Sequence, residues 1–441
     1  MTGLITFPSR AWPASLRHAA FITAALILPA TALAQSASPE DQEALIAELQ
    51  EKLREQEARL EKLEQLIAQP SPESPTSVQS ASDPAPERLA PHRAAASPAA
   101  PVKASPLKVS GDMRLRYEHN NTVDGQRNDS RGAFRGRVAA VYKASPGLKF
   151  GARLVTGDPD NPNSSDVSLS NFNDDLKVSL DQLYGMKSFG SLTVMGGKFP
   201  NPFRRTDLVW DGDVNPQGVA AQYAAIDTGS TQIGASALLF PIERSVGGPD
   251  SKATGYQLTL DHQPADTWSV GLAAGYYDYE IEATDTADAG DTRTNLLDAS
   301  GTYISDFDLL DIIADLSYTG LGERWPISLQ AEYVQNYGAD AHDTGYSFST
   351  SFGRTEAVGE YSFGYGYNVA EADAVFAAFA QDNIPYASNY RQHALSFTYA
   401  LSDQLDFNTT LYSFRLKDVS LVPFGNTDWQ QRLRINLVAH F

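Results

Sequence analysis

Arginines recur at alternate positions in short segments at both ends of the region that follows residue 105. Residues two apart lie on the same face of an extended strand, so each segment has a basic face and an apolar face. The arginines that this spacing places on basic faces are Arg114, Arg116, Arg135, Arg137, Arg153, Arg432 and Arg434. Because guanidinium groups stay charged and bind carboxylates and phosphates, we expect these residues to form one wall that attracts anions.

Acidic residues that could oppose this wall occur in an expected loop, residues 200–216, and in two later expected strands. They are Asp207, Asp211 and Asp213 in the loop, and Asp311, Asp315 and Glu332 in the strands. Opposed charges across a narrow, water-filled passage create a transverse field that hydrated, dipolar solutes can follow. The simpler alternative is that the arginines pair with neighbouring acids and only hold the wall rigid.

These residue types do not indicate catalysis. The histidines show no metal-ligand spacing, and neither a Gly-x-Ser-x-Gly nor a phosphate-loop pattern is present. We therefore expect no enzymatic activity, no cofactor and no metal site, with a Ser-His-acid site on the outer wall of a barrel as the alternative. The formal net charge of -20 disfavours nucleic acid as a partner.

The basic faces need strands whose other face is apolar. From Leu107 onward the chain consists of short alternating segments, such as residues 134–142, FRGRVAAVY. A soluble sandwich also alternates, but it seldom carries several arginines on the minority face of successive strands. A membrane barrel does so because its lumen is wet and its apolar face meets lipid. We therefore predict an all-β fold, a transmembrane antiparallel β-barrel spanning residues 106–441.

The number of strands follows from loop lengths. If residues 294–303, TNLLDASGTY, belong to a long loop, every short turn falls at the periplasmic end and every long loop at the external end. Sixteen strands result, an even number as in bacterial single-chain barrels. A barrel of this size encloses an aqueous channel, and residues 200–216 become its third external loop.

The segment before the barrel has three expected parts. Residues 1–34 have the charged start, the apolar stretch and the Ala32-Leu33-Ala34 site of a secretory signal peptide. Residues 35–69 carry four heptads and predict a helical coiled coil, and residues 70–105 are a disordered linker rich in Pro, Ala and Ser.

The expected helix also predicts an oligomeric state. Its a and d positions are Ile46, Leu49, Leu53, Leu60, Leu63 and Ile67, with Gln56 as the only polar residue. The segment RLEKLE, residues 59–64, resembles a motif of three-stranded coils, which implies a homotrimer. A single solvated helix or a dimer is the alternative.

The chain ends in the alternating segment WQQRLRINLVAHF, residues 429–441. Its apolar face resembles the C-terminal signal by which the barrel-assembly machinery recognises outer-membrane barrels. The residues that carry this resemblance are Leu433, Ile435, Leu437 and Phe441.

Across residues 107–441 the chain resembles the putative porin family of proteobacterial outer membranes. The segments that carry the resemblance, in order, are DMRLRYE, RGRVAAVY, RLVTGDP, GGKFPNPF, LVWDGDVNPQGVA, DFDLLDI, EYVQN and EADAVFAAF. The resemblance implies passive diffusion of small hydrophilic solutes through the outer membrane of a Gram-negative bacterium.

Several partners and one other function follow from this interpretation. The expected partners are outer-membrane lipid and lipopolysaccharide, two further copies of the chain, and peptidoglycan near a periplasmic stalk. The alternative function is envelope tethering or adhesion, in which the barrel is only an anchor and the stalk contacts peptidoglycan.

Overall fold

The structure is a computed structural model that describes residues 105–121, 129–159, 161–169, 176–245, 248–282, 294–422 and 425–441. The expected signal peptide, coiled coil and most of the expected linker lie outside these residues. The chain divides into two compact units, Met1–Ala81 and Ser82–Phe441, and all described residues belong to the second. None of the described residues forms a helix with the length and hydropathy of a bilayer span.

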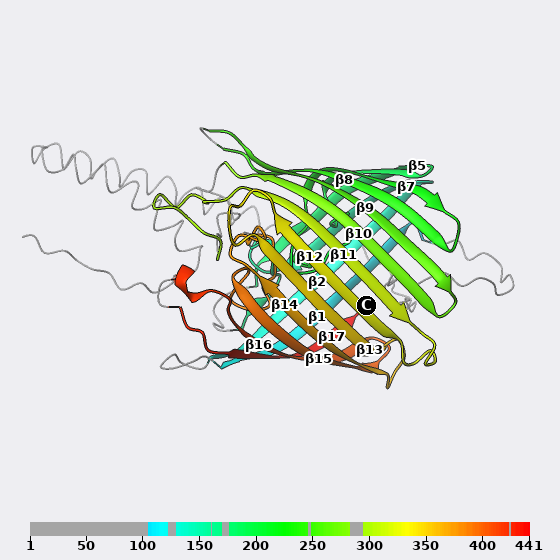
Figure 1. Ribbon diagram of the computed structural model, residues 1–441. Coiled ribbons are helices and arrows are strands. Elements are labelled where there is room, and N and C mark those ends of the chain that lie inside the picture. The colour runs from blue at the N-terminus through cyan, green and yellow to red at the C-terminus, as the bar shows by residue number, and fades with distance from the viewer. Residues whose placement is uncertain are drawn as a thin grey trace, which may run out of the picture. The chain divides into compact units, whose positions relative to one another are not determined.

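The described residues form one antiparallel sheet (Figure 1). Its strands are β1 (Leu107–Asn121), β2 (Asp129–Ser145), β3 (Leu148–Thr156), β4 (Val167–Ser168), β5 (Val178–Phe189), β6 (Leu192–Lys198), β7 (Gln217–Asp227), β8 (Thr231–Glu243), β9 (Ser251–Ala265), β10 (Trp268–Glu280), β11 (Phe307–Tyr318), β12 (Ile327–Asn336), β13 (Thr344–Gly353), β14 (Tyr361–Ala370), β15 (Tyr390–Ser402), β16 (Leu405–Leu416) and β17 (Gln430–His440).

The sheet closes into a barrel because β1 pairs with both β2 and β17. Strand β4 is a two-residue segment that pairs with the outer part of β2. Because β3 pairs directly with β5, β4 is not one of the strands that form the wall of the barrel. Sixteen strands therefore surround the lumen, as predicted. Residues 294–306 contain one isolated bridge between Leu297 and Tyr303, so the expected long loop is also confirmed.

The two faces of the barrel have opposite character. Large apolar side chains on the outer face are open to the surroundings, for example Leu115 at 52% and Leu258 at 63% exposure. The residues between them face the lumen and are mostly polar or charged. This is the pattern of a barrel that meets lipid outside and water inside.

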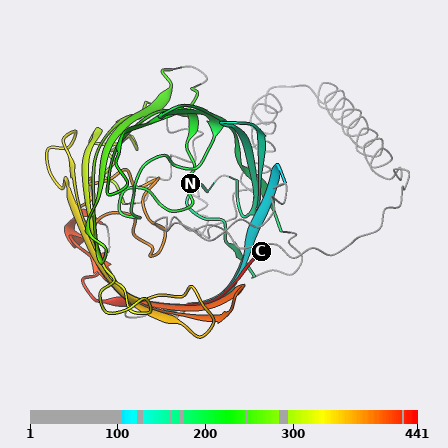
Figure 2. The same cartoon turned by 90° about the vertical axis from the view of Figure 1, so that its right-hand side faces the viewer.

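The hydrophobic core lies inside the barrel. It is formed by lumen-facing side chains of the barrel strands and by two long loops that fold into the lumen, residues 199–216 between β6 and β7 and residues 371–389 between β14 and β15. Figure 2 shows green and orange segments crossing the interior of the ring. Trp210 of the first loop stacks on Phe379 of the second at 5.7 Å and 7°. We call residues 199–216 the constriction loop and residues 371–389 the second inner loop.

The last residue completes the closure of the barrel. The backbone of Phe441 exchanges two hydrogen bonds with Gly111, at 2.9 and 3.1 Å. A Cβ atom at position 111 would lie 2.4 Å from the Phe441 ring and 2.3 Å from the carbonyl oxygen of Arg137. Glycine is therefore required where β1 passes between β2 and the C-terminus.

We expect Gly111→Ala to destabilise the barrel by about 1–3 kcal/mol, because the added methyl group overlaps two neighbours. The measurement is the urea concentration at which half of the barrel is unfolded. The mobility of unheated protein on electrophoresis distinguishes the folded from the unfolded form. Gly132→Ala is the matched control, since its Cβ would meet nothing closer than 3.5 Å. Equal midpoints for the two variants would contradict this account of closure.

Candidate functional site

The seven predicted arginines lie together on one side of the lumen. They come from β1, β2, β3 and β17, which become neighbours when β17 pairs with β1. Arg114 stands directly opposite Arg135 in the register of β1 and β2. We call this set, with Arg131 of β2 added, the arginine wall.

Each of the seven arginines also has an acidic partner. This agrees with the alternative that the arginines pair with neighbouring acids and hold the wall rigid. Asp112 accepts from Arg135 and Arg137, each at 2.7 Å. Asp166 accepts from Arg114 and Arg116, each at 2.6 Å.

The remaining pairs extend the arginine wall in both directions. Glu118 lies 2.7 Å from Arg434, 3.7 Å from Arg432 and 3.0 Å from Arg131, and Arg153 pairs with Asp181. With Asp213, which meets Arg137, the eight arginines share five carboxylates, leaving three positive charges in excess.

The constriction loop crosses the lumen from the arginine wall to the opposite strands. Near one end Asp213 accepts from Arg137 of β2 at 3.1 Å. At the other, Arg204 donates to both carboxylate oxygens of Asp261 on β9, at 2.6 and 2.7 Å. Between them Thr206 donates to Glu332 of β12. The loop is therefore held at several points around the barrel.

The second inner loop binds the constriction loop and the arginine wall together. The amide of Asp211 donates to the carbonyl of Phe379 at 2.8 Å, and the amide of Gln381 donates to the carbonyl of Asp207 at 3.0 Å. Asn383 donates to the Asp207 carboxylate and accepts from Arg434, both at 2.9 Å. Asn383 thus links the two loops to the wall.

The predicted acids have three different settings. Asp213 meets the arginine wall, and Asp207 and Asp315 line an open cavity. Asp211 is buried in the contact between the two loops. Asp311 and Glu332 are only 1% and 4% exposed, so the prediction that they face the open passage is wrong. Glu332 lies under Thr206, because the constriction loop packs on this part of the barrel.

Burial, followed by the charges of Asp207 and Asp382, raises the pKa of Asp211 from its ordinary 3.8 to about 8. The carboxyl is therefore largely protonated at neutral pH. By contrast, Arg114 and Arg116 hold the pKa of Asp166, in the loop before β4, below its ordinary value despite its burial. Asp166 thus stays charged beside the wall.

An aqueous cavity of about 800 Å³ lies beside the two inner loops. Its wall is formed by β11 to β16 and consists mainly of hydroxyl and amide side chains, and Asp207 and Asn383 reach it from the inner loops. Six of the hydroxyl residues are Ser317, Ser328, Ser347, Ser349, Ser396 and Thr410. This part of the lumen is polar, and among the described residues that line it the only ionisable carboxylates are those of Asp207 and Asp315, in contrast to the arginine wall. In the described part of the chain, no group of His, Asp or Glu has the arrangement of a metal site.

Several residues of the site were not among those predicted. Asp112 and Glu118 share the lumen face of β1 with Arg114 and Arg116, so strand alternation could have identified them. The second inner loop was not predicted to enter the lumen, although its run of Ala and Phe is unusually apolar for an external loop. Nothing in the sequence pattern indicates that Asn383 links the loops.

A closed barrel of sixteen strands, with a polar lumen and two loops folded across it, is the fold of the porin class. Residues 120–302 match the sequence model of the family described as "Putative porin". The resemblance to this family is therefore confirmed.

One solved structure has the same fold, and a second is similar to it more distantly. A high-pH structure of Pseudomonas putida OprB is 12% identical, with coverage of 76% of this chain and 94% of that chain and a TM-score of 0.51. A mutant of Rhodopseudomonas blastica porin is 10% identical, with coverage of 76% and 100% and a TM-score of 0.44. No curated protein matches the sequence.

We expect docking of the two inner loops to weaken as the pH rises from about 4 to about 8. The free carboxyl of Asp211 ionises near its ordinary 3.8, whereas the docked one keeps its proton until about pH 8, so protons favour the docked state. Hydrogen exchange at the Asp211 and Gln381 amides, corrected for intrinsic rates, should show protection falling by about tenfold or more over this range.

In Asp211→Asn the same protection should vary less with pH, because no proton is bound or released at this position and only Asp207, whose pKa is also raised by burial, still titrates in the contact. Asp298→Asn, in an external loop, is the control and should behave as the unmodified protein. An unchanged pH dependence in Asp211→Asn would contradict this role for the carboxyl.

Proposed function

We propose that the protein is a porin through which small hydrophilic solutes diffuse passively, with a preference for anions. The observation that carries this proposal is the crossing of the lumen by the constriction loop, whose Asp213 meets the arginine wall. Solutes that pass the two inner loops travel through a lumen that carries fixed charges. Diffusion of this kind requires neither a catalyst nor a cofactor.

The charge balance supports the sign of the preference. The arginine wall exceeds its acidic partners by three charges, whereas the cavity beside β11 to β16 carries the carboxylates of Asp207 and Asp315, the second of which lies 3.6 Å from Arg204. Protonation of Asp211 below about pH 8 removes one negative charge from the facing loop. Fixed charges at a constriction set which ions enter, so the excess of arginine favours anions.

The test is the reversal potential of single channels in planar bilayers under a salt gradient. Arg137→Gln removes a charge that reaches both β1 and the constriction loop, and it should lower the anion-to-cation permeability ratio by about threefold. Asp213→Asn removes the opposing charge and should raise the ratio. The control is Arg324→Gln, because Arg324 lies over Trp325 in a short turn outside the lumen.

Two results would count against the proposal. Cation selectivity that neither lumen variant changes would exclude the arginine wall as the selectivity element. A barrel with no conductance at all would favour the anchor function, in which the stalk contacts peptidoglycan.

We also propose that the coiled coil at residues 35–69 holds three copies together in the periplasm. Replacing Leu53 and Leu60 by Asn should reduce the trimer fraction by about tenfold, since buried polar groups at two seam positions weaken a coil. Mass photometry in detergent measures the trimer fraction. Replacing Gln56, already polar, by Glu is the control, and equal trimer fractions in both variants would refute the role of the coil.

A further inference from the structure

Two arginines face outward at the external end of the barrel. Arg391 of β15 and Arg415 of β16 are direct cross-strand partners. Their sequence neighbours Gln392 and Phe414 are buried on the inner side, so alternation places both guanidinium groups on the outer face. Exposed Leu395 and Leu411 lie on the same face, closer to the middle of the strands.

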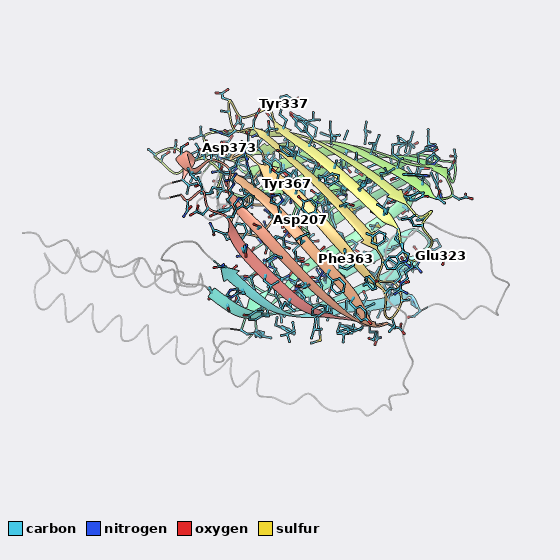
Figure 3. All side chains as sticks on the ribbon, turned by 60° about the horizontal axis from the view of Figure 1, so that its bottom comes forward. Asp207, Glu323, Tyr337, Phe363, Tyr367 and Asp373 are labelled. Atoms are coloured by element: carbon cyan, nitrogen blue, oxygen red, sulfur yellow. The ribbon has the colours of Figure 1, made fainter. Side chains whose placement is uncertain are left out.

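The position of this pair along the barrel axis can be deduced from the lengths of the loops at the two ends of β15. Arg391 is the second residue after the long second inner loop, whereas β15 and β16 are joined at their other ends by a short turn. Figure 3 places Tyr367, on the neighbouring strand β14, closer to the end that carries Asp373 than to the end that carries Glu323. The pair therefore lies near the external rim of the barrel.

Aromatic side chains mark this level as the edge of the membrane. The guanidinium group of Arg415 lies 4.9 Å from the centre of the Trp429 ring. The ring of His393 lies on the same face, with its centre 5.2 Å from that of Trp429. Tyr367 continues the row at 4.8 Å from His393. Belts of Trp and Tyr occur where the headgroups of lipids meet the hydrocarbon, so Arg415 stands at headgroup level.

Within the described residues neither guanidinium has a carboxylate within 4 Å, unlike the arginines of the arginine wall. The Nε atoms of Arg391 and Arg415 are buried and have no hydrogen-bond partner. Like charges placed directly opposite each other on a sheet destabilise it. An anion held between the two groups would remove this repulsion.

We propose that Arg391 and Arg415 form a binding site for a phosphate group of an outer-leaflet lipid. Guanidinium groups bind phosphate oxygens through paired, charge-assisted hydrogen bonds, and two of them side by side can share one phosphate. The outward position favours a lipid over a soluble anion, because Leu395 and Leu411 below the pair face the acyl chains. Trp429 holds the Arg415 guanidinium toward the headgroups.

The test is retention of lipid A by the purified full-length protein in detergent, measured by native mass spectrometry. The double variant Arg391→Gln, Arg415→Gln should bind bisphosphorylated lipid A about 10- to 30-fold more weakly than the unmodified protein. Phosphate-free lipid A should bind both proteins equally weakly. Mobility of the unheated protein on electrophoresis confirms that the variant is folded.

A matched control removes two positive charges from the same rim. Lys252→Gln with Lys417→Gln is suitable, because Lys252 pairs with Glu280 at 2.9 Å and Lys417 with Glu371 at 2.7 Å. This variant should retain lipid A. Equal loss of lipid A in both double variants would overturn the site, and so would retention of phosphate-free lipid A by the unmodified protein as strong as that of bisphosphorylated lipid A. Displacement of lipid A by equimolar inorganic phosphate would overturn its assignment to a lipid.

Discussion

Pairing of the first strand with the last is the interaction on which the rest of this structure depends. A sheet in a bilayer cannot leave backbone groups unpaired at an edge, so β1 and β17 must meet. The same closure places Arg434 beside Glu118, 316 residues earlier in the chain. Without the β1 and β17 ladder, the arginines of β17 would have neither their carboxylate partner nor a lumen to face.

The lumen then tolerates an excess of charge that a dry interior would not. Burying unpaired cations in a low-dielectric core is costly, so the four buried arginines, Arg116, Arg135, Arg432 and Arg434, each have a carboxylate partner, while the more exposed arginines of the wall keep part of their hydration. Five carboxylates therefore suffice for eight arginines. The pairs fix the side chains in position, and the remaining charge is available to solutes. The two interpretations of the arginines, structural pairing and charge selection, are compatible.

The sequence allowed the barrel to be predicted more completely than its contents. Strand alternation identified the seven arginines, because side chains of a strand alternate between its two faces. Loop length identified sixteen strands, because short turns lie at one end of the barrel and long loops at the other. It could not reveal that Asp311 and Glu332 would be buried, since that depends on where the constriction loop packs. It also did not reveal Asn383, whose role arises from contacts among Asp207, Arg434 and two loops distant in sequence.

The location of the hydrophobic core reverses the usual relation between core and solvent. The outer face of this barrel is surrounded by lipid, where apolar side chains gain little by meeting one another. Water is expelled from apolar surface mainly where Trp210, Phe379 and their neighbours pack inside the lumen. That packing includes side chains from strands on several sides of the ring, so the core of this protein depends on the closure of its wall.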